Sequence, residues 1–176
     1  MRWAALALAL FVSSGNAQER VRGVISAVSG DEISVGDKKV RVGDKTELVY
    51  TQPIVLGDIK PGSFLAVTSQ KGPDGQLSAI EVRVQPRPIS PGHRPFDGRD
   101  DQTMTNANLD AMVQASTGRE LTLSYPGGSQ KILVPESAAL FALVPGNRSQ
   151  LVPGAPVNLT HDAGGVALRV QVGPKR

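Results

Sequence analysis

The stretch that decides the fold reads VGDKTELVYTQPIVLGDIKPGSFLAVTS at residues 42–69, and a second copy reads VPESAALFALVPGNRSQLVPGAPVNLTH at residues 134–161. The two copies align without a gap, so that the Pro-Gly pair 61–62 falls on the Pro-Gly pair 153–154. An ungapped match with coincident turns indicates an internal duplication.

The similarity extends beyond both ends of the two copies. Upstream, Ile33 and Val35 correspond to Leu121 and Leu123 once a longer turn at residues 125–128 is allowed for. Downstream, three apolar residues at alternate positions, Ile80, Val82 and Val84, correspond to Leu168, Val170 and Val172. We therefore expect a first unit at residues 18–85 and a second unit at residues 106–176, each roughly seventy residues long.

Each unit has the pattern of short strands. Apolar and polar residues alternate at 40–42, 80–84, 121–125 and 169–172, which is the period of a half-buried strand. Gly-rich and Pro-Gly turns separate these segments, and short helical turns are expected only at 56–60 and 149–152. The predicted fold is all-β, with two tandem small OB-like β-barrels joined by a Pro-rich segment; β-sandwich units are the alternative.

The N-terminus has the pattern of a signal peptide at residues 1–17. Arg2 precedes an apolar run at residues 3–12, which is about half the length of a transmembrane helix. Small residues follow, and we expect cleavage after Ala17. The mature chain would then begin at Gln18 and be periplasmic or secreted, with no transmembrane segment.

The composition excludes several classes of mechanism. There is no cysteine, which rules out disulfides, thiolate metal sites and a cysteine nucleophile. Nineteen basic residues face sixteen acidic ones, and the two signs are intermixed along the chain instead of forming basic clusters. Because aromatic residues are also scarce, we do not expect a nucleic acid partner.

The segment between the units, residues 86–105, is the Pro-rich connection. It contains four prolines and few aliphatic residues, which argues against its continuing a sheet. It also holds the candidate residues for binding a ligand or partner, which are His93, Arg94, Phe96 and Asp97. Two interpretations stay open, namely a solvated linker and a binding loop folded over a barrel face.

A metal site is a weaker hypothesis. Imidazole nitrogen and carboxylate oxygen could ligate a metal, but the spacing of the available residues is unlike that of known sites. The weak candidates are His93, Asp97, Asp100, Asp101 and His161. We expect no bound metal and no cofactor.

Three further motifs carry a family resemblance. They are Asp-Ile-Lys-Pro-Gly at 58–62, Gly-His-Arg-Pro-Phe-Asp at 92–97 and Met-Thr-Asn-Ala at 104–107. Together with the tandem layout behind a signal peptide, they resemble a family of exported proteobacterial proteins, domain of unknown function 5666. The resemblance covers the whole mature chain and implies that the connecting segment is part of the folded design. It implies no activity.

No enzyme motif is present, so we expect a protein without catalytic activity. The chain lacks a nucleophile elbow, a phosphate-binding loop, a dinucleotide fingerprint and a zinc-protease motif. The leading hypothesis is a binding or adaptor module with an envelope protein as partner, because OB-type barrels present one face to a ligand. The alternatives are a metal- or small-ligand-binding protein and a structural envelope protein.

Overall fold

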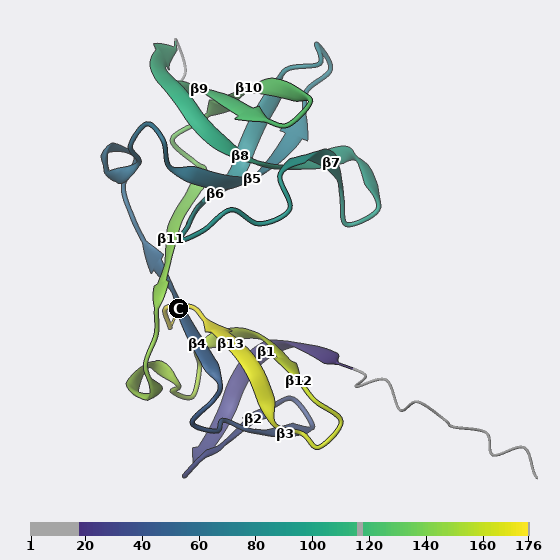
Figure 1. Ribbon diagram of the computed structural model, residues 1–176, viewed down its shortest axis with the longest axis vertical. Coiled ribbons are helices and arrows are strands. Elements are labelled where there is room, and N and C mark those ends of the chain that lie inside the picture. Colours follow the sequence, from purple (N-terminus) through teal and green to yellow (C-terminus); the bar gives the residue numbers. More distant parts are fainter. Residues whose placement is uncertain (1–17, 116–117, 176) are drawn as a thin grey trace, which may run out of the picture.

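The computed structural model describes residues 18–115 and 118–175. The predicted signal peptide at 1–17 lies outside the described residues. The chain is all-β, which confirms the predicted fold class, and its strands form two lobes stacked along the long axis (Figure 1). Among the described residues, no helix has the length and apolar character that crossing a membrane requires.

Each repeat folds into the same series of elements. The first contains β1 (Glu19–Ser29), β2 (Glu32–Val35), β3 (Lys38–Arg41), β4 (Glu47–Pro53), the 3-10 turn η1 (Leu56–Asp58), β5 (Phe64–Lys71) and β6 (Leu77–Gln85). After β7 (Gly92–Phe96), the second contains β8 (Arg99–Ala115), β9 (Gly118–Tyr125), β10 (Gly128–Val134), β11 (Ala139–Pro145), the 3-10 turn η2 (Arg148–Gln150), β12 (Pro156–His161) and β13 (Ala167–Val172).

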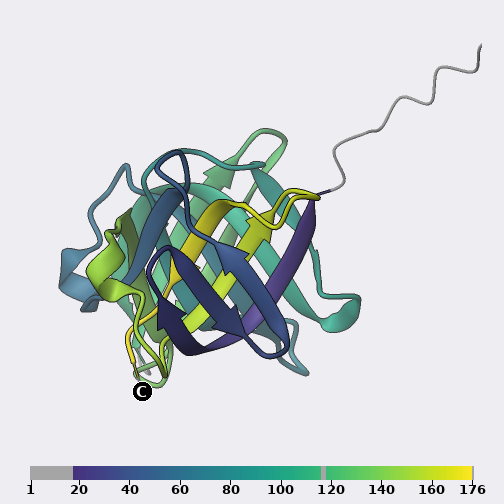
Figure 2. The ribbon, with the colours of Figure 1, turned by 90° about the horizontal axis from the view of Figure 1, so that it is seen from below.

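The two repeats exchange strands between the lobes. Lobe A combines β1, β2 and β3 of the first repeat with β12 and β13 of the second, and β1 pairs antiparallel with β12. Lobe B combines β8, β9 and β10 of the second repeat with β5 and β6 of the first, and β8 pairs antiparallel with β5. The purple β1 and the yellow β13 accordingly lie in the same lobe, although they come from opposite ends of the chain (Figure 1). Figure 2 shows the molecule from the side of this lobe.

Strands β4 and β11 cross the waist between the lobes and pair antiparallel with each other. Their register places Leu143 opposite Thr51, and these two residues occupy the same position in the two repeats. A pseudo-two-fold axis therefore passes through this pair. On the outer sides, β4 pairs parallel with β13, and β11 pairs parallel with β6, so one hydrogen-bonded sheet runs through both lobes.

A further parallel pairing closes each lobe into a partial ring. In lobe B, Ile132 of β10 pairs with Leu77 of β6. In lobe A, Arg41 at the end of β3 forms an isolated parallel bridge to Val166. Because the corresponding positions meet in both lobes, the barrel-like curvature is a property of the repeat. Closure also removes strand edges that would otherwise be exposed.

Two hydrophobic clusters fill the lobes, and each draws on both repeats. The cluster of lobe A consists of Ile25, Ile33, Val35, Val40, Val42, Leu151, Ala155, Val157, Leu159, Ala167, Val170 and Val172. The cluster of lobe B consists of Ile59, Leu65, Val67, Leu77, Ala79, Val82, Ala107, Leu109, Leu121, Leu123, Ile132 and Val134. The clusters thus cross the predicted boundaries at residues 85 and 106, because β4 and β11 carry the chain from one lobe to the other.

The expectation that residues 86–105 do not continue a sheet is wrong. Residues 92–96 form β7, and residues 99–105 form the first part of β8. Strand β7 pairs with β8 alone, and a proline is tolerated on such an edge strand because no partner needs its missing N–H.

The exchange predicts that residues 18–85 alone do not form a folded monomer, because β1 to β3 then lack β12 and β13. We expect this fragment to be unfolded, or to pair as a symmetric dimer in which each copy supplies the strands that the other lacks. Circular dichroism and analytical ultracentrifugation check this. A folded monomer of residues 18–85 would contradict the strand exchange.

Candidate functional site

Strands β7 and β8 form a hairpin that holds all the residues predicted to bind a ligand or partner. Phe96 pairs with Arg99 across the two-residue turn Asp97-Gly98. Asp97 has a φ of 56° and Gly98 a φ of 70°, which is the backbone of a type I′ turn. Asp-Gly is one of the sequences that this turn prefers, so these two residues are a signal of the hairpin in the sequence.

His93 fastens the edge strand β7 to β8. Its Nδ1 lies 2.8 Å from the hydroxyl oxygen of Thr105, the residue opposite it in β8. Burial lowers the pKa of His93 from its ordinary value of 6.5, because desolvation disfavours the imidazolium. Thr105 is fully buried, so its hydroxyl is closed to a substrate. The pair is therefore an anchor and not a nucleophile with its base.

Polar contacts hold the remainder of the hairpin. Asn106 Nδ2 and Arg94 Nη1 both donate to the carbonyl of Ser90, each at 3.2 Å. At the tip, Arg99 donates two hydrogen bonds of 3.1 Å to the carboxylate of Asp101. Asp101 also accepts from Gln70 of β5 at 3.3 Å. The hairpin is thus tied to its own strands and to β5 by hydrogen bonds and ion pairs.

The structure brings the four predicted binding residues onto one hairpin but not into a cavity. Arg94 and Asp97 are exposed, while His93 and Phe96 are half-buried. No residue of β7 belongs to either hydrophobic cluster.

The weak metal candidates do not converge. His161 lies on β12 in lobe A, where its Nδ1 is 2.7 Å from the carbonyl oxygen of Asp162 and its Nε2 is 3.7 Å from Glu19. His93 lies in lobe B, and Asp101 is engaged by Arg99. Within residues 18–115 and 118–175, no group of three or more His, Cys, Asp or Glu side chains is placed to share a metal ion.

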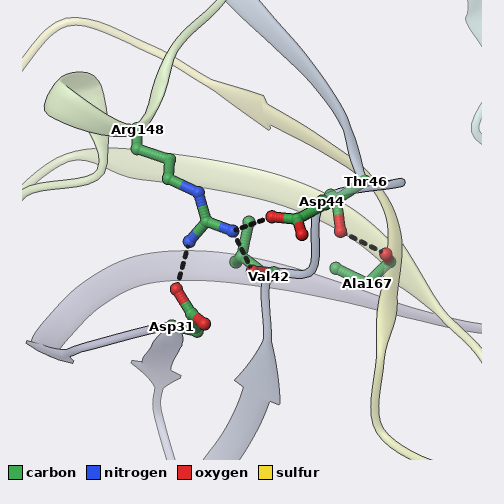
Figure 3. A network of polar contacts seen from close by, with 6 residues as sticks. All are labelled: Asp31, Val42, Asp44, Thr46, Arg148 and Ala167. Atoms are coloured by element: carbon green, nitrogen blue, oxygen red, sulfur yellow. Dashed lines mark hydrogen bonds and ion pairs between the residues drawn. The ribbon is translucent and has the colours of Figure 1, made fainter.

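At one end of lobe A, Arg148, the first residue of η2, makes a network of polar contacts (Figure 3). Its guanidinium donates to Asp31 Oδ1 at 2.7 Å and to the carbonyl of Val42 at 2.6 Å, and it lies 3.7 Å from the carboxylate of Asp44. Nearby, Thr46 donates to the carbonyl of Ala167 at 2.7 Å. Arg148, called the plug below, therefore bridges η2, the β1–β2 turn and the β3–β4 connection, while 41% of its side chain stays exposed.

The equivalent end of lobe B is an open cavity of about 510 Å³. It lies between η1, the end of β8, the start of β9 and the β10–β11 connection. Its lining is mostly apolar, with Gln114, Arg119 and Glu136 as polar members. The apolar lining residues are Ile54, Val55, Leu56, Val134, Pro135, Ala138 and Leu140. This site was not among the predicted ones, although the alignment of the repeats places Leu56 on Arg148.

The lowered pKa of His93 predicts that acid loosens the hairpin. The unfolded segment binds a proton more readily than the folded one, so the stability of the hairpin is present above pH 6.5 and is lost as the pH falls below it. We expect amide hydrogen exchange of residues 92–96 to accelerate between pH 7.5 and 5.5, after correction for intrinsic exchange. The variant His93→Gln should lose this pH dependence, and an unchanged dependence in that variant would assign it to another group.

The comparisons with known proteins identify one family. Residues 22–83 match the family described as Domain of unknown function (DUF5666). No curated protein and no solved structure matches the chain. The match begins within β1 and ends within β6, so it spans most of the first sequence repeat, whose strands the chain distributes over both lobes. The resemblance to this family is thereby confirmed for residues 22–83.

Proposed function

We propose that the protein is an exported binding module without catalytic activity, which captures a polypeptide partner in the cell envelope through the β7–β8 hairpin. One observation carries the proposal. All four predicted binding residues lie on the edge strand β7 and its turn, and none of them belongs to either hydrophobic cluster.

Comparison of the repeats shows how the surroundings of β7 differ from those of the matching part of lobe A. Strand β1 is the counterpart of β8, since each makes the long antiparallel pairing within its lobe. Residues 103–106 of β8 have β7 on their free edge. The matching residues of β1, 19–22, pair with β12, and β2 joins β1 only from Ile25 onward. Among the described residues, therefore, β7 has no counterpart in lobe A.

The chemistry of the hairpin favours recognition by side chains. Pro95 removes one backbone donor from the edge strand, which weakens strand addition by a partner. Arg94 and Phe96, by contrast, are of the residue types that dominate binding energy at protein interfaces. A hairpin held by hydrogen bonds and a two-residue turn presents them at a small entropic cost.

Site-specific cross-linking tests the hairpin as the contact surface. A photoreactive residue at position 94 is expected to give a discrete adduct in the native envelope, and one at Lys39, on the exposed face of lobe A, is expected to give none. The double variant Arg94→Ala/Phe96→Ala, with the probe at position 97, should lose the adduct while keeping its circular dichroism spectrum. Equal adducts from positions 94 and 39, or an adduct that persists in the double variant, would refute the assignment.

Export predicts a defined mature N-terminus. The full chain, expressed with its own first seventeen residues in a Gram-negative bacterium, should be recovered from the periplasmic fraction beginning at Gln18. Intact mass and N-terminal sequencing check this. The variant Ala17→Arg should block cleavage, because the peptidase reads small residues at that position. Recovery of the uncleaved wild-type chain from the cytoplasm would contradict export.

A further inference from the structure

We propose that the open cavity of lobe B binds the C-terminus of a polypeptide whose last residue is apolar. The apolar side chain lies among Leu56, Ala138 and Leu140, and the terminal carboxylate pairs with the guanidinium of Arg119. This site is separate from the hairpin, because no residue between 86 and 106 lines the cavity.

The turns η1 and η2 lie at equivalent ends of the two lobes. Arg148 begins η2 and Leu56 begins η1, and in both turns the third side chain accepts a hydrogen bond from the amide of the residue before the turn. Asp58 accepts a hydrogen bond from the amide of Val55 at 3.0 Å, as Gln150 does from Asn147 at 2.9 Å. The two turns thus lie at equivalent places, although their side chains differ at every position. The side chain of Leu56 is too short to reach across the end of its lobe as the guanidinium of Arg148 does.

One lining position carries opposite charges in the two lobes. In lobe A, Asp31 lies opposite Val42, where the amide of Val42 donates to the carbonyl of Asp31. In lobe B, the register places Arg119 opposite Val134, at the same position. The carboxylate of Asp31 is the closest acidic contact of the plug, and lobe B has a guanidinium there. A cation at this position repels a basic occupant and attracts a carboxylate.

The charged residues of the cavity lining favour a peptide C-terminus over a fatty acid. The cavity lining contains one acidic residue, Glu136, which is the counterpart of Asp44, and one basic residue, Arg119. In the part of the chain that the structure describes, neither residue has an ion-pair partner. A peptide terminus supplies both a carboxylate for Arg119 and backbone N–H donors for Glu136, whereas a fatty acid brings only the negative charge.

The volume of the cavity is that of a small-ligand site. Pockets that bind small ligands enclose about 300–1,000 Å³, and this cavity of about 510 Å³ falls within that range. It accommodates one apolar side chain with the adjoining backbone. Val55, which is 66% exposed, borders the opening. It offers an apolar contact to the penultimate residue of the bound peptide.

The test uses residues 18–176 and a pool of hexapeptides with randomised last two positions, synthesised with either a free carboxylate or an amide at the C-terminus. We expect peptides with a last apolar residue and a free carboxylate to be enriched. Amidation of the best peptide should weaken its affinity, measured by calorimetry, about tenfold or more, because a charge-assisted contact is lost. Equal binding of the amide, or no preference for an apolar last residue, would overturn the proposal.

Two variants of the cavity and one of lobe A sharpen the result. Arg119→Gln should lower the affinity as much as amidation does. Leu56→Arg/Arg119→Asp should rebuild the plug of lobe A and abolish binding, while Arg148→Met in lobe A should leave the affinity within about twofold. If the double variant does not fold by circular dichroism, Arg119→Gln decides. Two results would overturn the assignment. One is an unchanged peptide affinity in Arg119→Gln, and the other is a protein that binds decanoate but none of the peptides.

Discussion

The structure depends on the pairing of β4 with β11 at the waist. Leu143 faces Thr51 across this pair, and both side chains are nearly buried. Gln171 of β13 donates a hydrogen bond of 3.0 Å to the hydroxyl of Thr51, which satisfies that polar group. Because these two strands run through the waist, each repeat leaves the lobe in which it began and ends in the other. The exchange of strands, the continuous sheet and the composition of both cores follow from this crossing.

The crossing makes the two lobes dependent on each other. A domain of about sixty residues buries only about 60% of the surface that its unfolded chain exposes, so a single repeat is marginal as a folding unit. Exchange lets each lobe bury apolar residues from both repeats. The cost lies in folding kinetics, because contacts such as that of β1 with β12 join distant parts of the chain.

Much of the local structure was predictable from the sequence. Alternating apolar residues marked the strands, and the position before each Pro-Gly pair marked η1 and η2. The partners of the strands were not predictable, because tandem and exchanged barrels bury the same apolar faces. Strand β7 was missed because prolines argue against a strand, whereas on an edge strand Pro95 needs no partner for its missing N–H. The predicted binding residues did fall on one element, and the cavity was overlooked because its defining feature is a difference between the repeats.

That difference between the repeats carries more information than their similarity. Residues that the two copies share, such as the Pro-Gly pairs and the apolar strand positions, are those that the fold requires in both lobes. Arg148 and Asp31 form a contact in lobe A, and both of their counterparts, Leu56 and Arg119, have changed in lobe B. Loss of the arginine alone would only remove the ion-pair partner of Asp31, whose side chain is largely exposed. The paired change also places the guanidinium of Arg119 in the lining of a mostly apolar cavity. Because a cation in such a place attracts a carboxylate, the proposed peptide site depends on these two differences in charge between the repeats.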